Sequence, residues 1–173
     1  MILSDVKILK EVRSECSGFE IEPFHKDNVQ PASYDLTLAE DFLKPCESML
    51  PRNITEKPQY NQTIPLVKPG EFLLASTVEK ITLPNGLCGR VEGRSSIGRL
   101  GLFIQNAGWI DSGFSGQITL ELFNASRTPI ELKPGMRICQ AIFERAHRSK
   151  NLYDGKYQNQ KGTTGSKIEQ DFS

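Results

Sequence analysis

The stretch Gln117-Ile118-Thr119-Leu120-Glu121-Leu122-Phe123 decides the fold of this 173-residue chain. Apolar and polar residues alternate along it, and a β-strand points successive side chains to opposite faces. We therefore predict a strand whose core face carries Ile118, Leu120 and Leu122. Glu121 would then lie on the face opposite the core.

Turn signals surround this strand on both sides, at roughly 10- to 15-residue intervals. Lys68-Pro69-Gly70 and Lys133-Pro134-Gly135 each fit a tight turn that leads into a strand. Proline presets φ at the second turn position, and glycine tolerates a positive φ at the third. Further turn signals lie at 83–86, 111–113 and 124–127. This rhythm predicts a mainly β domain, an antiparallel barrel or sandwich.

The two ends of the chain differ from this β region. Ser4 can cap a short helix that runs through Val12. Residues 49–66 are rich in Pro, Asn, Gln and Lys, which predicts a long polar excursion, with a hairpin as one alternative. Residues 151–173 have few aliphatic side chains, which favours a mobile tail, either a frayed end or a functional flap. We predict one β domain over 1–150, with the tail over 151–173 belonging to it.

The charge balance argues against nucleic-acid and membrane partners. Lys plus Arg and Asp plus Glu both count 21, so no overall positive field would hold a nucleic-acid backbone or an anionic membrane. The first seven residues lack the pattern of a secretory signal, and no apolar run is long enough to cross a bilayer. We expect a cytoplasmic protein. Its four cysteines stand far apart, which predicts reduced, mostly buried thiols: Cys16, Cys46, Cys88 and Cys139.

Glu121 is a candidate for acid–base chemistry. Glutamate is depleted in the middle of strands, and a carboxyl group between Thr119 and Phe123 would be partly desolvated, which favours its protonated form. General acids and bases are prepared in this way. An isolated glutamate on a solvated outer face fits the same pattern, so this residue alone leaves both interpretations open.

The segment Glu92-Gly93-Arg94-Ser95-Ser96-Ile97-Gly98-Arg99 is a candidate phosphate cradle. Small residues let an anion approach backbone N–H groups, and arginine forms forked hydrogen bonds to phosphate. The segment is neither a Walker sequence nor a dinucleotide fingerprint. A solvated turn is the alternative that the residues leave open.

The sequence lacks the signature of a zinc-dependent nucleobase deaminase, which needs an H-x-E and a P-C-x-x-C to hold the metal. Its two histidines, His25 and His147, lie in polar surroundings. We therefore expect surface histidines, with no zinc site and no histidine-based triad.

Three ordered segments, 93–102, 107–116 and 118–124, closely resemble the dCTP deaminase branch of the dUTPase superfamily. Weaker similarity covers 30–36 and 155–162, and only 46–66 lacks an obvious counterpart. The resemblance implies a distorted antiparallel β-barrel of the dUTPase-like β-clip or jelly-roll type, with a short N-terminal helix and a flexible C-terminal flap. It also implies a homotrimer with active sites shared between subunits, and Mg²⁺ bound through the triphosphate and water rather than by protein ligands.

The same resemblance implies roles for individual residues. Glu121 would take a proton from water as it attacks C4 of cytosine, then pass it to the departing ammonia. Ser95 and the Ala107 carbonyl would hold that water, and Arg99 would stabilise the site electrostatically. Asp111 would face the deoxyribose 3′-hydroxyl. The implied nucleotide-binding residues are Arg94, Ser95, Ser96, Ile97, Gly98, Arg99, Asp111, Thr119, Leu120, Glu121, Gln140 and, in a flap closing over the triphosphate, Tyr153, Lys156 and Gln160.

Two features separate the relatives from one another. Plain dUTPases lack a glutamate at the position of Glu121, so this residue favours deamination. The Ala-Gly-Trp-Ile-Asp segment at 107–111, together with Gln140, favours the bifunctional group that turns dCTP into dUMP, pyrophosphate and ammonia for dTMP synthesis. There Asp111 would also orient the water that attacks the α-phosphate.

Several alternatives stay open. They are a deaminase that stops at dUTP, a dUTPase, a nucleotide-binding trimer without turnover, and a carbohydrate- or nucleic-acid-binding β domain. The last of these is disfavoured by the zero net charge and the few exposed aromatic clusters. dTTP is a candidate inhibitor.

Overall fold

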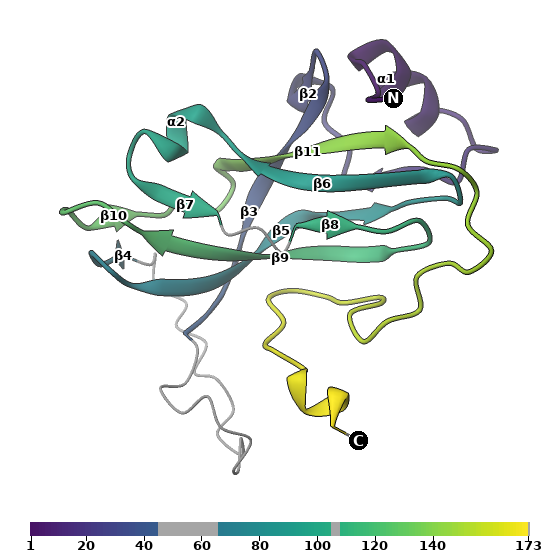
Figure 1. Ribbon diagram of the computed structural model, residues 1–173. Helices are drawn as coiled ribbons and strands as arrows, with labels where there is room; N and C mark the ends of the chain where they lie inside the picture. Colours follow the sequence, from purple (N-terminus) through teal and green to yellow (C-terminus); the bar gives the residue numbers. More distant parts are fainter. Residues whose placement is uncertain (45–65, 105–107, 173) are drawn as a thin grey trace.

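The protein is built on one curled antiparallel sheet, seen in a computed structural model that describes residues 1–44, 66–104 and 108–172 (Figure 1). The sheet contains β1 (Glu20–Glu22), β2 (Val29–Gln30), β3 (Ser33–Leu43), β5 (Phe72–Thr82), β6 (Leu87–Gly93), β7 (Leu102–Ile104), β8 (Trp109–Ile110), β9 (Ser115–Asn124) and β11 (Arg137–Arg145). Its order is β7-β9-β5-β3-β11-β6-β8, with β1 added to β5 and β2 to β3. Within the described ranges β7 and β8 do not pair with each other, so the sheet is an open, distorted barrel. The predicted mainly β fold is confirmed.

Smaller elements complete the fold. β4 (Leu66–Val67) and β10 (Ile130–Glu131) form a separate two-stranded ribbon. The helices are α1 (Asp5–Val12), α2 (Ser95–Gly98) and the 3₁₀ turns η1 (Lys26–Asn28) and η2 (Ile168–Asp171). In the described parts of the chain, no helix is long and apolar enough to cross a membrane. The predicted polar excursion lies almost wholly within 45–65, outside the described residues.

The two Lys-Pro-Gly segments form the predicted turns. In the first, the Glu71 N–H donates to the Lys68 carbonyl at 3.0 Å, and Gly70 has φ +74°. In the second, Met136 donates to Lys133 at 3.1 Å, and Gly135 has φ +82°. The left-handed conformation at the third position explains why glycine stands there. These turns begin β5 and β11, two of the longest strands of the sheet.

Strand β9 alternates as predicted. Ile118, Leu120 and Leu122 are buried, whereas Glu121 is only partly buried on the other face. The buried side chains join a single apolar core to which nearly every strand contributes, with Tyr34, Leu36, Ala75 and Phe143 at its centre. Burial of each large apolar side chain contributes about 1.5–3 kcal/mol. The core therefore holds β9 in a fixed orientation, and Glu121 with it.

The N-terminal helix has the predicted bounds but not the predicted cap. Ser4 occupies the N-cap position and its side chain makes no capping hydrogen bond. Instead, the Asp5 carboxylate accepts from the Val6 N–H at 2.7 Å. A carboxylate in the first turn also interacts favourably with the helix dipole, so the serine hydroxyl is not required there.

Other sequence predictions have mixed outcomes. His25 and His147 are exposed, as expected. Cys88 and Cys139 are free and buried, and burial raises the pKa of the Cys139 thiol. Cys16 is the exposed one of the three described cysteines and lies beyond the end of α1. Cys46 lies outside the described residues.

In β3, apolar and polar residues alternate over 34–38, but Asp35 does not follow the burial that this alternation favours. This side chain should face solvent between two core residues, yet it is only 2% exposed. Arg94 and Arg137 cover it from two other parts of the chain. A carboxylate can be buried when paired charges replace its lost hydration.

Between residues 146 and 172, the part of the tail that the structure describes, there is no strand, and η2 is the regular element. The tail is nevertheless tied to the barrel rather than frayed. The Tyr153 N–H donates to the Ser112 carbonyl at 2.9 Å, and the Asn159 N–H to the Ser115 carbonyl at 2.7 Å. The tail therefore runs beside the start of β9, where it can affect the residues on that strand.

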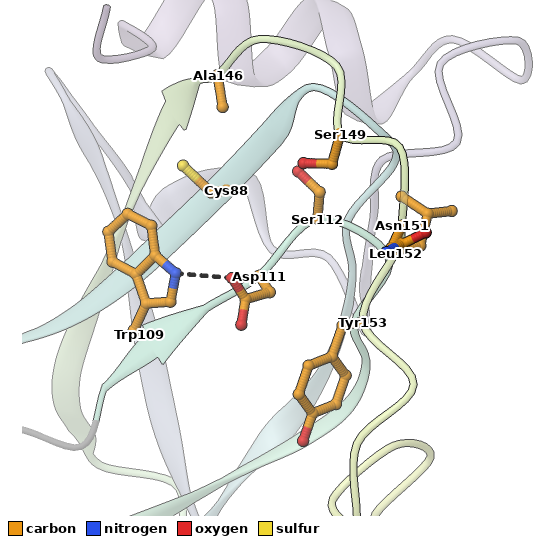
Figure 2. Close-up of a pocket in the computed structure, with 9 residues that line it drawn as sticks. All are labelled: Cys88, Trp109, Asp111, Ser112, Ala146, Ser149, Asn151, Leu152 and Tyr153. Carbon is orange, nitrogen blue, oxygen red and sulfur yellow. Dashed lines mark hydrogen bonds between the residues drawn. The ribbon is translucent and has the colours of Figure 1, made fainter.

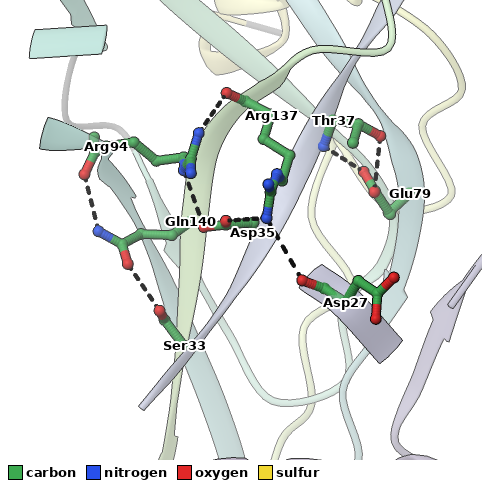
Figure 3. Close-up of polar contacts among 9 residues, drawn as sticks. Asp27, Ser33, Asp35, Thr37, Glu79, Arg94, Arg137 and Gln140 are labelled. Carbon is green, nitrogen blue, oxygen red and sulfur yellow. Dashed lines mark hydrogen bonds and ion pairs between the residues drawn. The ribbon is translucent and has the colours of Figure 1, made fainter. Parts of the chain in front are cut away.

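A second buried carboxylate, Glu79 in β5, is fully enclosed and bonded to Thr37 (Figure 3). Its two oxygens accept from the Thr37 N–H at 2.9 Å and the Thr37 hydroxyl at 2.8 Å. Burial raises the pKa of Glu79, and the hydrogen bonds from Thr37 only partly offset that effect. The folded protein therefore holds a proton at Glu79 at pH values where the unfolded chain has released it.

This shift predicts a pH-dependent stability. Because the folded-state pKa is raised, the contribution of Glu79 is present below the ordinary glutamate pKa and is lost as pH rises through the raised value. Denaturant unfolding measured from about pH 4 to pH 8 should show this decline, and Glu79→Gln should flatten it. Glu20→Gln, an exposed control on β1, should leave the slope unchanged. An identical slope in Glu79→Gln would show that this carboxyl does not titrate differently on folding.

Candidate active site

Glu121 lines a small hollow beside β9. The other lining residues come from β9, from β6, from β7 and from the segment just before β8: Ile118, Thr119, Leu120, Val91, Ile104 and Gly108. The hollow measures about 20 Å³, which is on the order of the space for one water molecule. No hydrogen bond or ion pair to Glu121 comes from the described residues, so its carboxylate is available to a bound molecule.

Gly108 allows β8 to approach β6 at this hollow. A Cβ at this position would lie 3.0 Å from the Val91 Cβ and 3.1 Å from its carbonyl oxygen. The Val91 N–H donates to the Gly108 carbonyl at 2.8 Å, which holds the two segments together. A larger residue at 108 would push β8 away from β6. Glycine at this position therefore keeps the two segments close together where they line the hollow. Ala107, the predicted second holder of the water, lies outside the described residues.

Asp111 faces a different and larger pocket, of about 330 Å³ (Figure 2). The Trp109 indole N–H donates to one Asp111 oxygen at 2.9 Å. Tyr153 from the tail stands on the other side of the pocket, and its ring packs 5.8 Å from the Phe114 ring. The volume is within the roughly 300–1,000 Å³ range of small-molecule sites. The tail therefore supplies part of the wall around Asp111.

Residues 94–99, which we call the arginine-serine loop, follow β6 and contain α2. Ile97 is buried and anchors this short helix, while Ser95, Ser96, Gly98 and Arg99 are exposed. An anion could reach the exposed hydroxyls and glycine backbone from solvent. Ile97 can contribute only its backbone to such a site, because its side chain belongs to the core.

Arg94 is held in place by a carboxylate that sequence reasoning missed (Figure 3). Its Nε donates to Asp35 Oδ1 at 3.1 Å, and its Nη1 donates to the Arg137 carbonyl at 3.0 Å. Arg137 Nη1 in turn lies 3.4 Å from Asp35 Oδ2. The buried Asp35 thus orients two guanidinium groups. The local sequence gave only a weak signal, an aspartate directly between the apolar residues Tyr34 and Leu36.

Gln140 lies beside this ion-pair group and is occupied within its own chain. Its Nε2 donates to the Gly93 carbonyl at 3.0 Å, and its Oε1 accepts from the Ser33 hydroxyl at 2.7 Å (Figure 3). These bonds hold the start of the arginine-serine loop in place, where it leaves β6 at Gly93. A contact between Gln140 and a nucleotide base would require one of them to open.

The predicted flap residues also contact their own chain. Lys156 Nζ lies 2.7 Å from both carboxylate oxygens of Asp171, which raises the pKa of the lysine. Gln160 Nε2 donates to the Gln117 carbonyl at 2.6 Å, and its Oε1 is buried without a hydrogen-bond donor among the described residues. Both side chains therefore face the barrel or the tail itself.

Comparison with known proteins identifies the family. The profile of the dCTP deaminase-like family matches residues 2–146. The chain belongs to this family. Among its relatives, the Hydrogenobaculum sp. (strain Y04AAS1) protein named dCTP deaminase, dUMP-forming, is 48% identical over 181 residues, covering 99% of this chain and 98% of that protein. The protein of the same name from Sulfurihydrogenibium sp. (strain YO3AOP1) is 46% identical over 177 residues, covering 97% of each.

Solved structures show that the dCTP deaminase-like chain has the predicted dUTPase-like fold. The 2′-deoxycytidine 5′-triphosphate deaminase of Agrobacterium tumefaciens matches with a TM-score of 0.65 and 24% identity, covering 84% of this chain and 48% of that one. The native dUTPase of EIAV matches with a TM-score of 0.52 and 23% identity, covering 80% and 97%. Identities this low support the fold alone.

In this dCTP deaminase-like chain, seven of the predicted site residues fall into three groups. Thr119, Leu120 and Glu121 line the small hollow, and Asp111 lines the larger pocket with Tyr153. Arg94 and Gln140 belong to the group around Asp35. No described hydrogen bond or ion pair joins the first group to the third. Across the described ranges, no group of three or more His, Cys, Asp or Glu side chains is placed to hold a metal ion.

Proposed function

We propose that the protein hydrolyses dCTP to dUMP, pyrophosphate and ammonia. The observation that carries this proposal is Glu121, a mid-strand carboxylate without a described partner in a hollow on the order of one water in size. The relatives at 46% and 48% identity, named dCTP deaminase, dUMP-forming, support the same activity. The reaction consumes two waters, one at C4 of cytosine and one at the α-phosphate.

Deamination would take place at Glu121. The Glu121 carboxylate accepts a proton from water as the water oxygen bonds to C4. Glu121 then returns the proton to the amine as the C4–N bond breaks. Ser95 and the Ala107 carbonyl would hold the water, and Arg99 would stabilise the charge that develops. Such a mechanism needs no zinc, and protein stripped of metal with a chelator and resupplied with Mg²⁺ alone should therefore turn over dCTP.

Cleavage of the triphosphate would take place at Asp111. Trp109 binds one of its oxygens, and the other accepts no hydrogen bond from a described residue. That oxygen is available to orient a water toward the α-phosphate or to accept from the deoxyribose 3′-hydroxyl. The separate pockets of Glu121 and Asp111 suit two hydrolytic steps on one nucleotide.

A homotrimer would complete the site. The hollow at Glu121 is too small for a pyrimidine ring, so the base needs a second surface to lie against. On the same face of the sheet, Phe123 pairs with Phe72 in β5 and with Phe103 in β7. Phe72 and Phe103 are exposed, which is typical of a surface that another protein covers. A neighbouring subunit could cover this row and bring its arginine-serine loop to Glu121.

The substrate would be the Mg²⁺ complex of the triphosphate, in which phosphate oxygens and water are the natural ligands. The remaining nucleotide contacts would come from Arg94, Ser96, Gln140 and Lys156, with dTTP as a candidate inhibitor at the same site. The free thiols Cys88 and Cys139 suit a reducing compartment, and we place the protein in the cytoplasm.

Product analysis tests the proposal directly. The protein is incubated with dCTP and Mg²⁺, and dUTP, dUMP, pyrophosphate and ammonia are separated and measured. We expect dUMP, pyrophosphate and ammonia in equal amounts. Accumulation of dUTP without pyrophosphate would assign a deaminase that stops at the first step, and cleavage of dUTP without action on dCTP would assign a dUTPase. Nucleotide binding without any product would assign a regulatory binder.

A further inference from the structure

The tail approaches Glu121 along the edge of β9. The Gln117 N–H donates to the Gln160 carbonyl at 3.1 Å, and the Gly162 N–H donates to the Gln117 side-chain oxygen at 2.6 Å. Further along, the Thr164 N–H donates to the Thr119 hydroxyl at 3.1 Å. Thr119 lies two residues from Glu121 on the same face of the strand. The contacts thus advance along β9 and end beside the candidate base.

Asp41 binds the tail at Thr163, next to the contact between Thr164 and Thr119. It lies in β3 where the register with β5 shifts between Leu38 and Phe42, and such bulges re-aim side chains. One Asp41 carboxylate oxygen accepts from the Thr163 N–H and the other accepts from the Ser76 hydroxyl at 3.0 Å. The Thr163 hydroxyl donates to the Asp41 backbone carbonyl at 2.6 Å. Thr163 thus makes two hydrogen bonds with Asp41, and Ser76 makes one.

The burial of the neighbouring side chains supports a firm contact. Ser76 pairs with Thr119 and belongs to the outer face, yet it is fully buried. Thr163, although it belongs to an irregular tail, is 6% exposed. Burial favours a higher pKa for Asp41, but the hydrogen bonds from Thr163 and Ser76 outweigh this and hold the pKa below its ordinary value. Asp41 is thus ionised and bonded at neutral pH.

We propose that Asp41 is a positioning residue for the deamination of dCTP, which clasps Gly162–Thr164 of the tail against Ser76 and Thr119 beside Glu121. The inference rests on the proposed function, because it assigns the clasp a role in that reaction. The clasp sets where the tail lies before substrate arrives. It thereby lowers the ordering cost of closing the site over the nucleotide.

Three full-length variants test the clasp. Asp41→Ala removes the carboxylate from the barrel side. Gly162→Ala acts from the tail side, since a Cβ there would lie 2.7 Å from Asp41 Oδ2 and the residue has φ +62°. Gly165→Ala is the matched control, because nothing lies within 4 Å of its Cβ and its φ is outside the left-handed region. The Gly162→Ala change lies outside the apolar core, so it keeps the test valid if Asp41→Ala folds poorly.

Two measurements are made on each variant alongside the wild type. The first is the rate of tryptic cleavage after Lys161, an exposed residue next to the clasp. The second is KM and kcat for dCTP, with the denaturant midpoint as a check on the barrel. We expect Asp41→Ala and Gly162→Ala to raise the cleavage rate and KM by roughly tenfold to a hundredfold, with a smaller effect on kcat. The denaturant midpoint should stay unchanged in Gly162→Ala, whereas Asp41→Ala should lower it, because it leaves the buried Ser76 hydroxyl without its acceptor. Gly165→Ala should behave as the wild type does.

Each outcome decides one part of the inference. Unchanged cleavage in both clasp variants would overturn the clasp. Faster cleavage with unchanged KM and kcat would keep the clasp and overturn its role in catalysis. A wild-type protein that cleaves no dCTP would overturn the proposed function and the positioning role with it, while the proteolysis would still judge the contact itself.

Discussion

Replacing Glu121 with glutamine is expected to abolish ammonia release from dCTP while leaving nucleotide binding in place. A glutamine amide has nearly the same shape, but it cannot accept a proton from the attacking water. General acid–base groups contribute about 10²–10⁴-fold to rate, so kcat should fall by at least that range. Ammonia release measures the loss, and calorimetric titration with dCTP measures the binding that remains.

The control for this substitution is Glu131→Gln. Glu131 is an exposed glutamate on β10, outside the three groups of site residues. It should leave both turnover and binding unchanged. Because Glu121 makes no hydrogen bond to a described residue, the glutamine variant should also keep its stability. Unchanged ammonia release in Glu121→Gln would discard this residue as the proton carrier.

Asp35→Asn is expected to lower both the stability and the affinity for the triphosphate. The carboxylate is 2% exposed between Arg94 and Arg137, and breaking a buried ion pair costs about 3 kcal/mol. Arg94 would also lose its anchor, so KM for dCTP should rise by about tenfold, the effect of one lost charge-assisted hydrogen bond. Denaturant unfolding and steady-state kinetics below the transition measure the two effects.

Asp27→Asn provides the matched control, since Asp27 contributes only its backbone carbonyl to Arg137. Its stability and KM should match those of the wild type. A stability loss in Asp35→Asn without any change in KM would show that the ion pairs maintain the fold but do not prepare Arg94 for phosphate. No loss of stability would mean that the two arginines are rehydrated at no net cost.

The candidate site was only partly predictable from sequence. Glu121 and the arginine-serine loop carry local signals, namely a carboxylate opposite a core face and a dense group of small and cationic residues. Asp111 was implied only by the resemblance to dCTP deaminases. Gln140 carries no signal that its amide is already bonded to Ser33 and Gly93. The composition of residues 151–173 predicts a mobile tail, whereas the tail forms hydrogen bonds with β9. Composition alone does not indicate a specific hydrogen bond.

Local sequence determined the strands and turns of this protein. The alternation at 117–123 and the two Lys-Pro-Gly turns depend on side chains only a few residues apart, and steric rules at that range hold in any context. Tertiary structure alone decided which charges meet. Arg94 lies 59 residues from Asp35, and Thr163 lies 122 residues from Asp41. Strand order brings these partners together, and no property of either residue by itself specifies the other.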